Sequence, residues 1–318
     1  MVKILITGGS GFIGTNLIEF FKDYNCTILN LDYVRPKIYS HLQYWKEINI
    51  CNLKSLEKEV LAFRPDFIVH LAARTDLNGK SLKDYDSNIL GVQNILSVCD
   101  KIKNLKRVIF TSSMYVCEPG YQPADMSDYK PHTIYGESKV ITEKLIKEHA
   151  SKYTWCLIRP TSIWGPYFGE PYNLFFKIVL SGKYFHLGNR ACKKTYGFIE
   201  NFVYQLISLL EAPSETIHGN VYYLGDYEPY DISEWANEIG WKGGITIPTI
   251  PFFIFRIAAI FGDILKIIGL KFPMTSFRLQ NMTTDNVHDL SLIRQLAPNL
   301  PVSRIEGTIR TINWLRND

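Results

Sequence analysis

The chain has 318 residues, with 46% hydrophobic residues, 21% charged residues and a formal net charge of +4 at pH 7. These values are ordinary for a globular protein with one large core or two modest domains. The small charge and the lack of a basic run argue against a nucleic-acid partner, while a small anionic substrate stays open. The six cysteines form no CxxC pair and no metal-ligand spacing, which predicts reduced cysteines in a cytoplasmic protein without a bound metal.

Two apolar stretches raise the question of a membrane. Met1–Thr7 is too short for a signal peptide and leads straight into a glycine loop. Residues 245–270 are strongly apolar but include Arg256, Asp263 and Lys266, and each charge near a bilayer centre costs about 2.5–3.5 kcal/mol. We therefore expect no spanning helix here. A core helix is favoured over peripheral docking on a membrane surface.

The N-terminal half alternates short β-branched runs with helical stretches. The predicted strands are Val2–Thr7, Thr27–Asp32, Tyr44–Ile50, Phe67–Leu71, Arg107–Thr111 and Thr154–Arg159. The predicted helices are Phe12–Lys22, Leu53–Phe63, Lys83–Lys101 and Tyr135–Ser151. Strands separated by helices of this length indicate βαβ units, and hence an α/β fold with a doubly wound, parallel Rossmann sheet.

The alternation weakens after Arg159, where prolines and glycines cluster. We therefore predict a Rossmann domain over residues 1–165, followed over residues 166–318 by a smaller α/β region that mainly binds the substrate. The stretch 195–215 again has the pattern of a strand followed by a helix. It is expected to return to the first domain.

The first strand leads directly into TGGSGFIG, in which Gly9, Gly11 and Gly14 satisfy GxGxxG. Glycines permit a tight strand-to-helix turn and let the backbone approach a pyrophosphate, which the helix N-terminus then binds. Asp32 ends the next strand, where its carboxylate can accept bonds from ribose hydroxyls and would repel a 2′-phosphate. The segment therefore predicts a dinucleotide site and favours NAD over NADP. The nearby Arg35 keeps NADP open as an alternative.

A tyrosine and a lysine lie four residues apart at the start of a predicted helix. Tyr135 and Lys139 share one helix face, and an ammonium group beside a phenol is expected to lower the tyrosine pKa toward the range useful for acid–base catalysis. Ser113 follows the strand at 107–111, at the sheet edge where ligands bind in this class of fold. These three residues are the predicted catalytic group.

These motifs, in this order, resemble the extended short-chain dehydrogenases/reductases, and within them the NAD-dependent sugar-nucleotide epimerases and dehydratases, such as UDP-glucose 4-epimerase. The resemblance implies an NAD cofactor, a nucleotide-sugar substrate and a homodimer formed through the helices near 83–101 and 135–151. The segments that carry it span roughly the first 165 residues and are TGGSGFIG (7–14), Asp32, HLAA (70–73), Asn88, TSS (111–113), YGESK (135–139) and Arg159–Pro160.

The resemblance also implies contacts for both ligands. The implied cofactor contacts are Gly8, Gly11, Phe12, Ile13, Gly14, Asp32, Asn49, Ile50, Leu71, Ala72, Ala73, Asn88, Thr111, Tyr135, Lys139 and Pro160. The implied substrate contacts are Arg74, Thr75, Ser113, Ser162, Asn173, Lys194 and Arg278. Tyr196 stands where family members often have an arginine that binds the diphosphate. Arg190, Lys193 or Lys194 is expected to replace that arginine.

The residues after Ser113 narrow the reaction. The 4,6-dehydratases that the chain resembles carry an acidic pair at this place, whereas this chain has Met114 and Tyr115, and the glutamate typical of UDP-glucuronate decarboxylases is absent too. The favoured function is epimerisation of a nucleotide sugar, most simply at C4, by transient oxidation and return of the hydride to the opposite face. The alternatives are a dehydrogenase or keto-reductase, acting on a nucleotide sugar or a hydroxysteroid-like alcohol, and a non-catalytic nucleotide sensor.

Other conspicuous residues have structural roles in this interpretation. His70 is expected to be a packing residue rather than a ligand. Solvated helix faces are expected for Glu137 and Glu143, and core positions for Trp155, Trp164 and the PFFIF run at 251–255.

Overall fold

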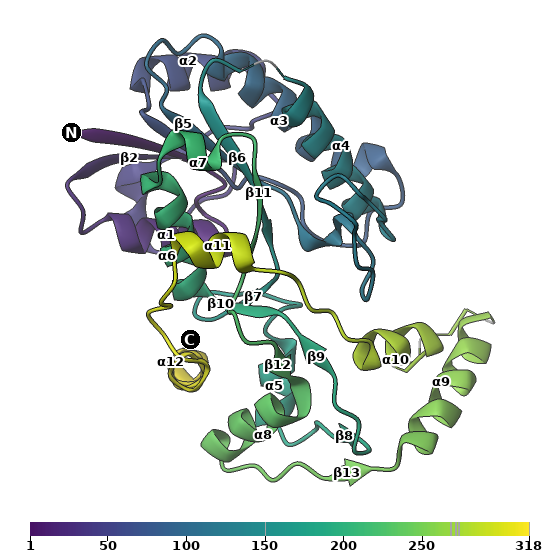
Figure 1. Cartoon of the computed structure of the whole chain (residues 1–318). Coiled ribbons are helices and arrows are strands. Elements are labelled where there is room, and N and C mark those ends of the chain that lie inside the picture. The colour runs from purple at the N-terminus through teal and green to yellow at the C-terminus, as the bar shows by residue number, and fades with distance from the viewer. Residues whose placement is uncertain (150, 268, 271, 273, 318) are drawn as a thin grey trace.

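Seven parallel strands form the central sheet, in the order β11-β6-β5-β4-β1-β2-β3 (Figure 1). The computed structural model describes residues 1–318 except Ala150, Ile268, Lys271, Pro273 and Asp318. The strands are β1 (Val2–Thr7), β2 (Cys26–Asp32), β3 (Trp45–Glu47), β4 (Phe67–His70), β5 (Arg107–Thr111), β6 (Thr154–Pro160) and β11 (Val221–Leu224). The order reverses between β1 and β4, which is the point where doubly wound sheets bind their ligands.

Helices cover both faces of this sheet. One face carries α2 (Leu53–Phe63), α3 (Asp86–Cys99) and α4 (Ile134–Glu148). The other carries α1 (Phe12–Phe21) and α6 (Ile199–Glu211), which pack against each other. Two shorter helices, α7 (Ser214–Ile217) and α11 (Ser291–Leu296), lie beside β6 and β11 respectively. The predicted Rossmann fold is confirmed.

Several predicted boundaries shift for local reasons. The strand expected over Tyr44–Ile50 contributes only β3, because residues 39–44 form a 3₁₀ helix and Asn49 turns the chain by accepting a bond from the Cys51 amide. The helix expected from Lys83 is a 3₁₀ turn, capped by Ser81 and Asp84, followed by α3. The helix expected over Tyr135–Ser151 ends at Glu148, and its predicted span includes Ala150, which lies outside the described residues.

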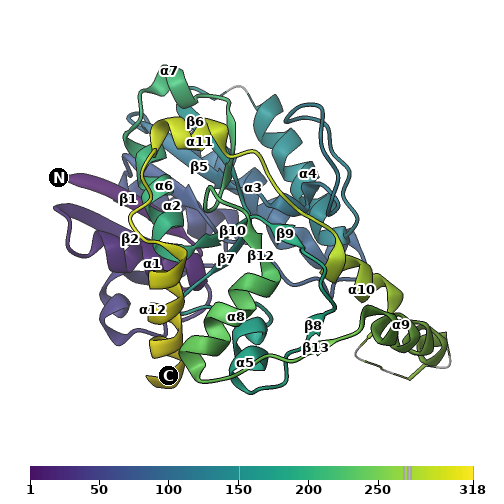
Figure 2. The ribbon, with the colours of Figure 1, turned by 60° about the horizontal axis from the view of Figure 1, so that its bottom comes forward.

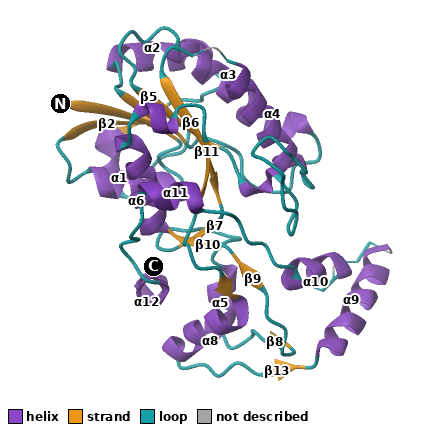
Figure 3. Cartoon of the chain, in the orientation of Figure 1, coloured by secondary structure: helices purple, strands orange, loops and turns teal. Residues whose placement is uncertain are grey.

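The region beyond β6 consists of short two-stranded sheets and helices (Figure 2). The strand pairs are β7 (Ser162–Trp164) with β10 (Tyr196–Phe198), β8 (His186–Leu187) with β13 (Thr249–Ile250), and β9 (Lys193–Lys194) with β12 (Tyr230–Asp231). The helices are α5 (Leu174–Leu180), α8 (Ile232–Gly243), α9 (Phe252–Ile267), α10 (Ser276–Thr283) and α12 (Arg304–Asn317). Figure 3 shows how little strand this region contains compared with the sheet above it.

The helix α9 does not lie in the core as predicted. It projects with α10 from the rest of the molecule in Figures 1 and 2, and Phe253 and Ile254, both in the PFFIF run, are exposed. Hydrophobic residues here follow the period of a helix, but among the described residues no helix or strand covers their face, so the prediction of a core helix was wrong. Within the described residues, no helix combines the length and the apolarity needed to cross a bilayer.

Candidate active site

The glycine loop between β1 and α1 lies too close to neighbouring backbone to carry side chains at two of its positions. Gly8 has φ +75°, and a Cβ there would stand 2.6 Å from the Ala72 amide nitrogen. A Cβ on Gly14 would stand 2.4 Å from the Gly9 Cα. Gly11 is the N-cap residue of α1 and offers no side-chain hydrogen bond to the first turn. The helix therefore presents backbone N–H groups that an anion can bind.

Asp32 lies at the end of β2 beside this loop. Its carboxylate accepts bonds from the Ser10 amide at 3.0 Å and the Val34 amide at 2.9 Å, so the side chain is fixed next to the glycine loop. Burial raises the pKa of Asp32, although these amide bonds oppose the shift. The position at the strand end is the one that Rossmann proteins use for ribose hydroxyls.

A cavity of about 800 Å³ runs from the glycine loop and the end of β2, past the ends of β4 and β5, to the turn after β6. Fifteen of the sixteen predicted cofactor contacts line it: Gly8, Gly11, Phe12, Ile13, Gly14, Asp32, Asn49, Ile50, Leu71, Ala72, Ala73, Thr111, Tyr135, Lys139 and Pro160. The Thr111 hydroxyl is buried without a protein partner, which a bound ligand would satisfy. The cavity and its donors therefore fit a dinucleotide.

Asn88, the remaining predicted contact, does not line the cavity but supports its wall. The side chain is 1% exposed. Its Oδ1 accepts from the Arg74 amide at 2.7 Å, and its Nδ2 donates to Arg74 O and Ser138 Oγ, each at 3.1 Å. Asn88 thus ties α3 to α4 and to the segment after β4. Its position is that of a support for the cofactor site.

The three predicted catalytic residues meet where β5 faces the first turns of α4. Ser113 and Tyr135 are both buried, and both line the cavity. Lys139 lies one turn further along α4 and donates to the Thr111 carbonyl oxygen at 2.9 Å. Thr133 caps α4 through the Gly136 amide, so the helix begins at the residue before Tyr135 and fixes its direction.

The protonation of this group differs from the sequence prediction. Burial raises the pKa of Tyr135 well above its ordinary value, and the Ser113 hydroxyl, rather than Lys139, opposes the shift. Burial also lowers the pKa of Lys139 to about 8, against the attraction of Glu143. The expectation that Lys139 by itself lowers the tyrosine pKa was therefore wrong for the protein alone.

The predicted substrate contacts divide into two sets. Arg74, Thr75, Ser113 and Ser162 line the cavity. The other three, Asn173, Lys194 and Arg278, do not. Asn173 is buried and donates to the Phe168 carbonyl, Lys194 donates to the Asn281 carbonyl at 2.6 Å, and Arg278 is exposed on α10. Their contacts with a substrate stay predictions.

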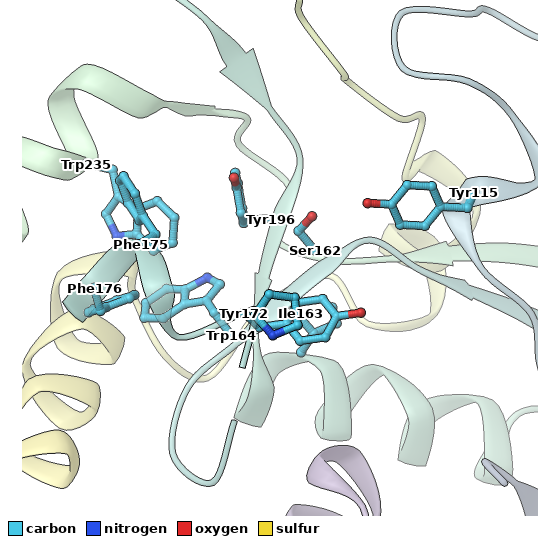
Figure 4. A pocket seen from close by; sticks show the side chains of 10 residues that line it. Tyr115, Ser162, Ile163, Trp164, Tyr172, Phe175, Phe176, Tyr196 and Trp235 are labelled. Atoms are coloured by element: carbon cyan, nitrogen blue, oxygen red, sulfur yellow. The ribbon is translucent and has the colours of Figure 1, made fainter. Parts of the chain in front are cut away.

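An aromatic pocket that the sequence analysis did not foresee opens beside Ser162 (Figure 4). It has a volume of about 260 Å³, and none of the described residues that line it carries a charge. Tyr196, which stands in place of an arginine, packs against Tyr230 and Trp235 with ring centroids 5.7 and 4.9 Å apart. The lining residues are Tyr115, Ser162, Ile163, Trp164, Pro171, Tyr172, Phe175, Phe176, Tyr196 and Trp235. The aromatic residues that follow Gly165 in the sequence were the signal from which this pocket could have been predicted.

Two other expectations concern buried charge near the site. His70 is a packing residue as predicted, because it is bonded to the Thr7 hydroxyl at 2.7 Å and burial lowers its pKa to about 3. The prediction for Glu143 was wrong, since this residue is 0% exposed and pairs with the equally buried Arg159. Burial of Glu143 is explained by this partner, which lies 16 residues further along the chain.

Four features together define a nicotinamide-dinucleotide enzyme that oxidises or reduces alcohols. They are the Rossmann sheet, the glycine loop at the uncapped N-terminus of α1, the acid at the end of β2, and the Ser-Tyr-Lys group in the same cavity. Comparison with protein families agrees: residues 4–225 match the NAD dependent epimerase/dehydratase family, and the chain belongs to that family. Its cofactor is NAD.

Individual relatives extend the comparison to almost the whole chain. The chain is 28% identical to N-acetyl-alpha-D-glucosaminyl-diphospho-ditrans,octacis-undecaprenol 4-epimerase of Escherichia coli O157:H7, with 98% of this chain and 95% of the relative covered. It is 26% identical to a 3-beta-hydroxysteroid dehydrogenase of Mycolicibacterium neoaurum, over 78% of this chain and 72% of that one. The UDP-glucuronic acid 4-epimerase of Bacillus cereus, solved with UDP-glucuronic acid and NAD, has the same fold, with a TM-score of 0.76 at 19% identity and 99% coverage of both chains.

Proposed function

We propose that the protein is an NAD-dependent 4-epimerase of a sugar that is carried on a diphosphate, as nucleotide sugars are. The observation that carries the proposal is the placement of Ser113 and Tyr135 together at the wall of the dinucleotide cavity, with Lys139 one turn away. The E. coli relative with 98% coverage of this chain is named as a 4-epimerase, and so is the B. cereus structural neighbour.

Each proton-transfer step of the proposed reaction is carried out by a residue of the catalytic group. Tyr135 removes the proton of the C4 hydroxyl, Ser113 holds that hydroxyl and then the ketone oxygen, and Tyr135 returns the proton to the epimer. Bound NAD, which the glycine loop and Asp32 would hold, would supply a hydride acceptor and donor and a positive nicotinamide that favours the phenolate. Lys139 contributes further positive charge to the site. No co-substrate is consumed, because oxidation and reduction occur in one cycle.

Epimerisation also requires that the keto sugar present both faces to the same hydride donor. The aromatic pocket beside Ser162 offers uncharged walls against which a sugar ring can turn without breaking strong polar contacts. Ser162, Tyr115 and Tyr172 line both this pocket and the dinucleotide cavity. We infer that the sugar occupies this junction, with Arg74 at the rim as a charged contact.

The residue that follows Ser113 supports epimerisation over elimination of water. Met114 carries no carboxyl group, and Tyr115 is a phenol whose pKa is raised by burial. Neither side chain can act as the acid and base pair of a dehydratase.

The second candidate function is a dehydrogenase or keto-reductase of a hydroxysteroid-like alcohol. The 26% identity to the hydroxysteroid dehydrogenase and the aromatic lining of the pocket favour it. Such an enzyme would convert one equivalent of NAD to NADH for each alcohol oxidised. An epimerase leaves the cofactor balance unchanged, so the two are separated by one absorbance measurement of NADH.

The test is a panel of diphosphate-linked sugars incubated with the purified protein, with product stereochemistry read by NMR. The panel contains UDP-, GDP- and dTDP-sugars and a polyprenyl-diphosphate sugar in vesicles. The proposal expects an equilibrium mixture of C4 epimers from at least one of them, without release of NADH. Stoichiometric NADH, or a keto product, would favour the dehydrogenase instead.

Four further proposals concern the domains of the enzyme, its oligomeric state, its location and its role. We propose that residues 1–165, with 195–215, form the cofactor domain and that 166–318 mainly bind substrate. We propose a homodimer in which α3 and α4 of two copies pack together, as the family resemblance implies. A cytoplasmic location is supported by the six cysteines, all of them free thiols, and the proposed role is in carbohydrate biosynthesis.

A further inference from the structure

The helix α9 exposes a continuous hydrophobic face. Phe253, Ile254, Ile257, Ile260, Phe261, Ile264 and Ile267 are each 45–84% exposed, and we call these residues the α9 ridge. At 100° per residue they fall within an arc of roughly 140°, which is the width of a complete apolar helix face. Exposed apolar patches of this size mark binding surfaces.

The opposite face of α9 is already in contact with the protein. Ala259 and Gly262 are buried, and a Cβ on Gly262 would overlap the Met274 carbonyl oxygen. Phe261, at one margin of the ridge, packs edge-on against Phe272 with ring centroids 5.6 Å apart. The helix is therefore held in a fixed orientation, with its ridge turned outward.

The charges around the ridge are arranged asymmetrically. Asp263, the one acidic residue of α9, accepts a bond from the Ser276 amide at 3.1 Å and so faces α10. At 100° per residue, the exposed Arg256 lies about 20° beyond one margin of the ridge, whereas the exposed Lys266 lies on the opposite side of the helix. An apolar helix face with a cation at its margin is the pattern of helices that lie in the surface of a bilayer.

We propose that the α9 ridge docks on the surface of a bilayer containing anionic lipids. The helix lies parallel to the membrane, its apolar side chains enter the boundary between headgroups and acyl chains, and Arg256 meets the lipid phosphates. The helix rests on the surface without spanning it, in agreement with its length of 16 residues.

The docking helix is connected to the catalytic group through α10. After α10 the chain pairs with β9 at Asn286, and the Asn286 side chain lies 3.9 Å from the Met114 sulfur and accepts from the Gly120 amide at 3.4 Å. Met114 follows Ser113 directly. The ridge and the mouth of the cavity therefore belong to connected parts of the molecule.

Docking of α9 also indicates which carrier holds the sugar, and this inference rests on the proposed epimerase function. A docked enzyme meets substrates whose diphosphate is anchored in the bilayer by a polyprenyl chain. The E. coli relative, matched over 98% of this chain including α9, is named for an undecaprenol diphosphate carrier. We infer that the substrate class is a sugar on a polyprenyl diphosphate.

The docking is tested by sedimentation of the full-length protein with vesicles of phosphatidylcholine, with and without phosphatidylglycerol. The variant Ile257→Glu/Ile264→Glu changes two ridge side chains that are 63% and 54% exposed, so the fold should persist. The matched control is Leu292→Glu/Ile305→Glu, whose side chains are 42% and 52% exposed on α11 and α12. We expect binding of the wild type and control to anionic vesicles, and roughly tenfold or more weaker binding of the ridge variant.

Two results of this experiment would overturn the docking. One is a wild-type protein that stays in the supernatant with both kinds of vesicle. The other is a halved mass for the ridge variant in sedimentation equilibrium, together with vesicle binding equal to that of the wild type, because the ridge would then bind a second copy of the chain. Circular dichroism of both variants establishes that they are folded.

The carrier is tested separately, so that failure of the epimerase assignment and failure of docking can be distinguished. The same sugar diphosphate is offered on undecaprenol in vesicles and on uridine in solution. The ridge variant should lose roughly tenfold or more in kcat/KM for the vesicle substrate, in proportion to its loss of vesicle binding, and nothing for any turnover of the uridine-linked sugar. Equal loss on both carriers overturns the docking role. Vesicle binding without turnover of either substrate leaves the docking standing and contradicts the epimerase assignment.

Discussion

Arg159 and Glu143 form a bidentate ion pair in which both side chains are 0% exposed. The Arg159 Nε and Nη2 atoms donate to the two Glu143 carboxylate oxygens, each at 2.8 Å. The same carboxylate accepts from Ser112 Oγ at 2.6 Å and from the Tyr129 hydroxyl at 2.9 Å. Because Glu143 lies one turn after Lys139 on α4, this pair fixes the catalytic helix against the ends of β5 and β6.

Removing one charge of this pair should destabilise the protein strongly. Glu143→Gln leaves the buried Arg159 guanidinium without its anion, and such a loss costs about 3–5 kcal/mol of unfolding free energy. Chemical denaturation measures the difference. The control is Glu137→Gln on the exposed face of α4, which should change stability by less than about 0.5 kcal/mol. Equal denaturation midpoints for both variants would contradict the structural role of the pair.

Replacement of Tyr135 by Phe removes the acid–base hydroxyl and little else, since the ring is buried against Tyr85 and Tyr115 at centroid distances of 6.0 Å. Turnover should fall by about 10²–10⁴-fold. NAD binding, followed by quenching of tryptophan fluorescence, should persist with a similar dissociation constant. A variant that retains wild-type turnover would show that the proton is moved by another group.

The choice of cofactor depends on Asp32. Asp32→Ser removes the carboxylate that would repel a 2′-phosphate, so the preference for NAD over NADP should fall by roughly tenfold or more. Parallel titrations with the two cofactors give the ratio of dissociation constants. If the ratio is the same in wild type and variant, Asp32 does not face the adenosine ribose.

Buried histidines predict loss of stability in mild acid. Burial lowers the pKa of His288 to about 4 and that of His70 to about 3, so the unfolded chain binds protons below pH 6.5 that the folded protein does not. Stability is therefore full above pH 6.5 and falls as the pH drops toward 4, by about 3 kcal/mol for His288. Asp226 opposes this trend, because burial raises its pKa to about 6.

The variant His288→Phe isolates this effect. The new ring keeps the stacking on Tyr223, where the centroids are 4.5 Å apart, but does not titrate. Denaturation midpoints at pH 7 and pH 5 should differ less in the variant than in the wild type. A difference between pH 7 and pH 5 that is as large in the variant as in the wild type would contradict the neutral state of the buried His288 ring.

Local motifs predicted the sheet and the cofactor cavity well, because each is encoded within a few residues. The glycine loop, Asp32 and the strand ends all lie where the βαβ pattern places them. The strand β11 was not predicted, since four apolar residues at 221–224 carry no signal that distinguishes a strand joining a distant sheet from a core segment.

Long-range partners explain the remaining differences. Burial of Glu143 depends on Arg159 from another strand, and the aromatic pocket is assembled from β7, α5, β10 and α8. For α9 the sequence showed apolar residues at helical spacing but not which face would be covered. Interleaved charges argued for a core helix, whereas the structure turns Asp263 inward and leaves the apolar face outside.

In the proposed reaction, one hydrogen leaves C4 of the sugar and returns to the same carbon. This is measured most directly with a diphosphate sugar deuterated at C4, whose label is followed by NMR during turnover in ordinary water. We expect the C4 epimer to keep its deuterium at C4, with no NADH released. Loss of the label from the epimer, or its appearance in free NADH, would show that the hydrogen does not return to C4 within one cycle.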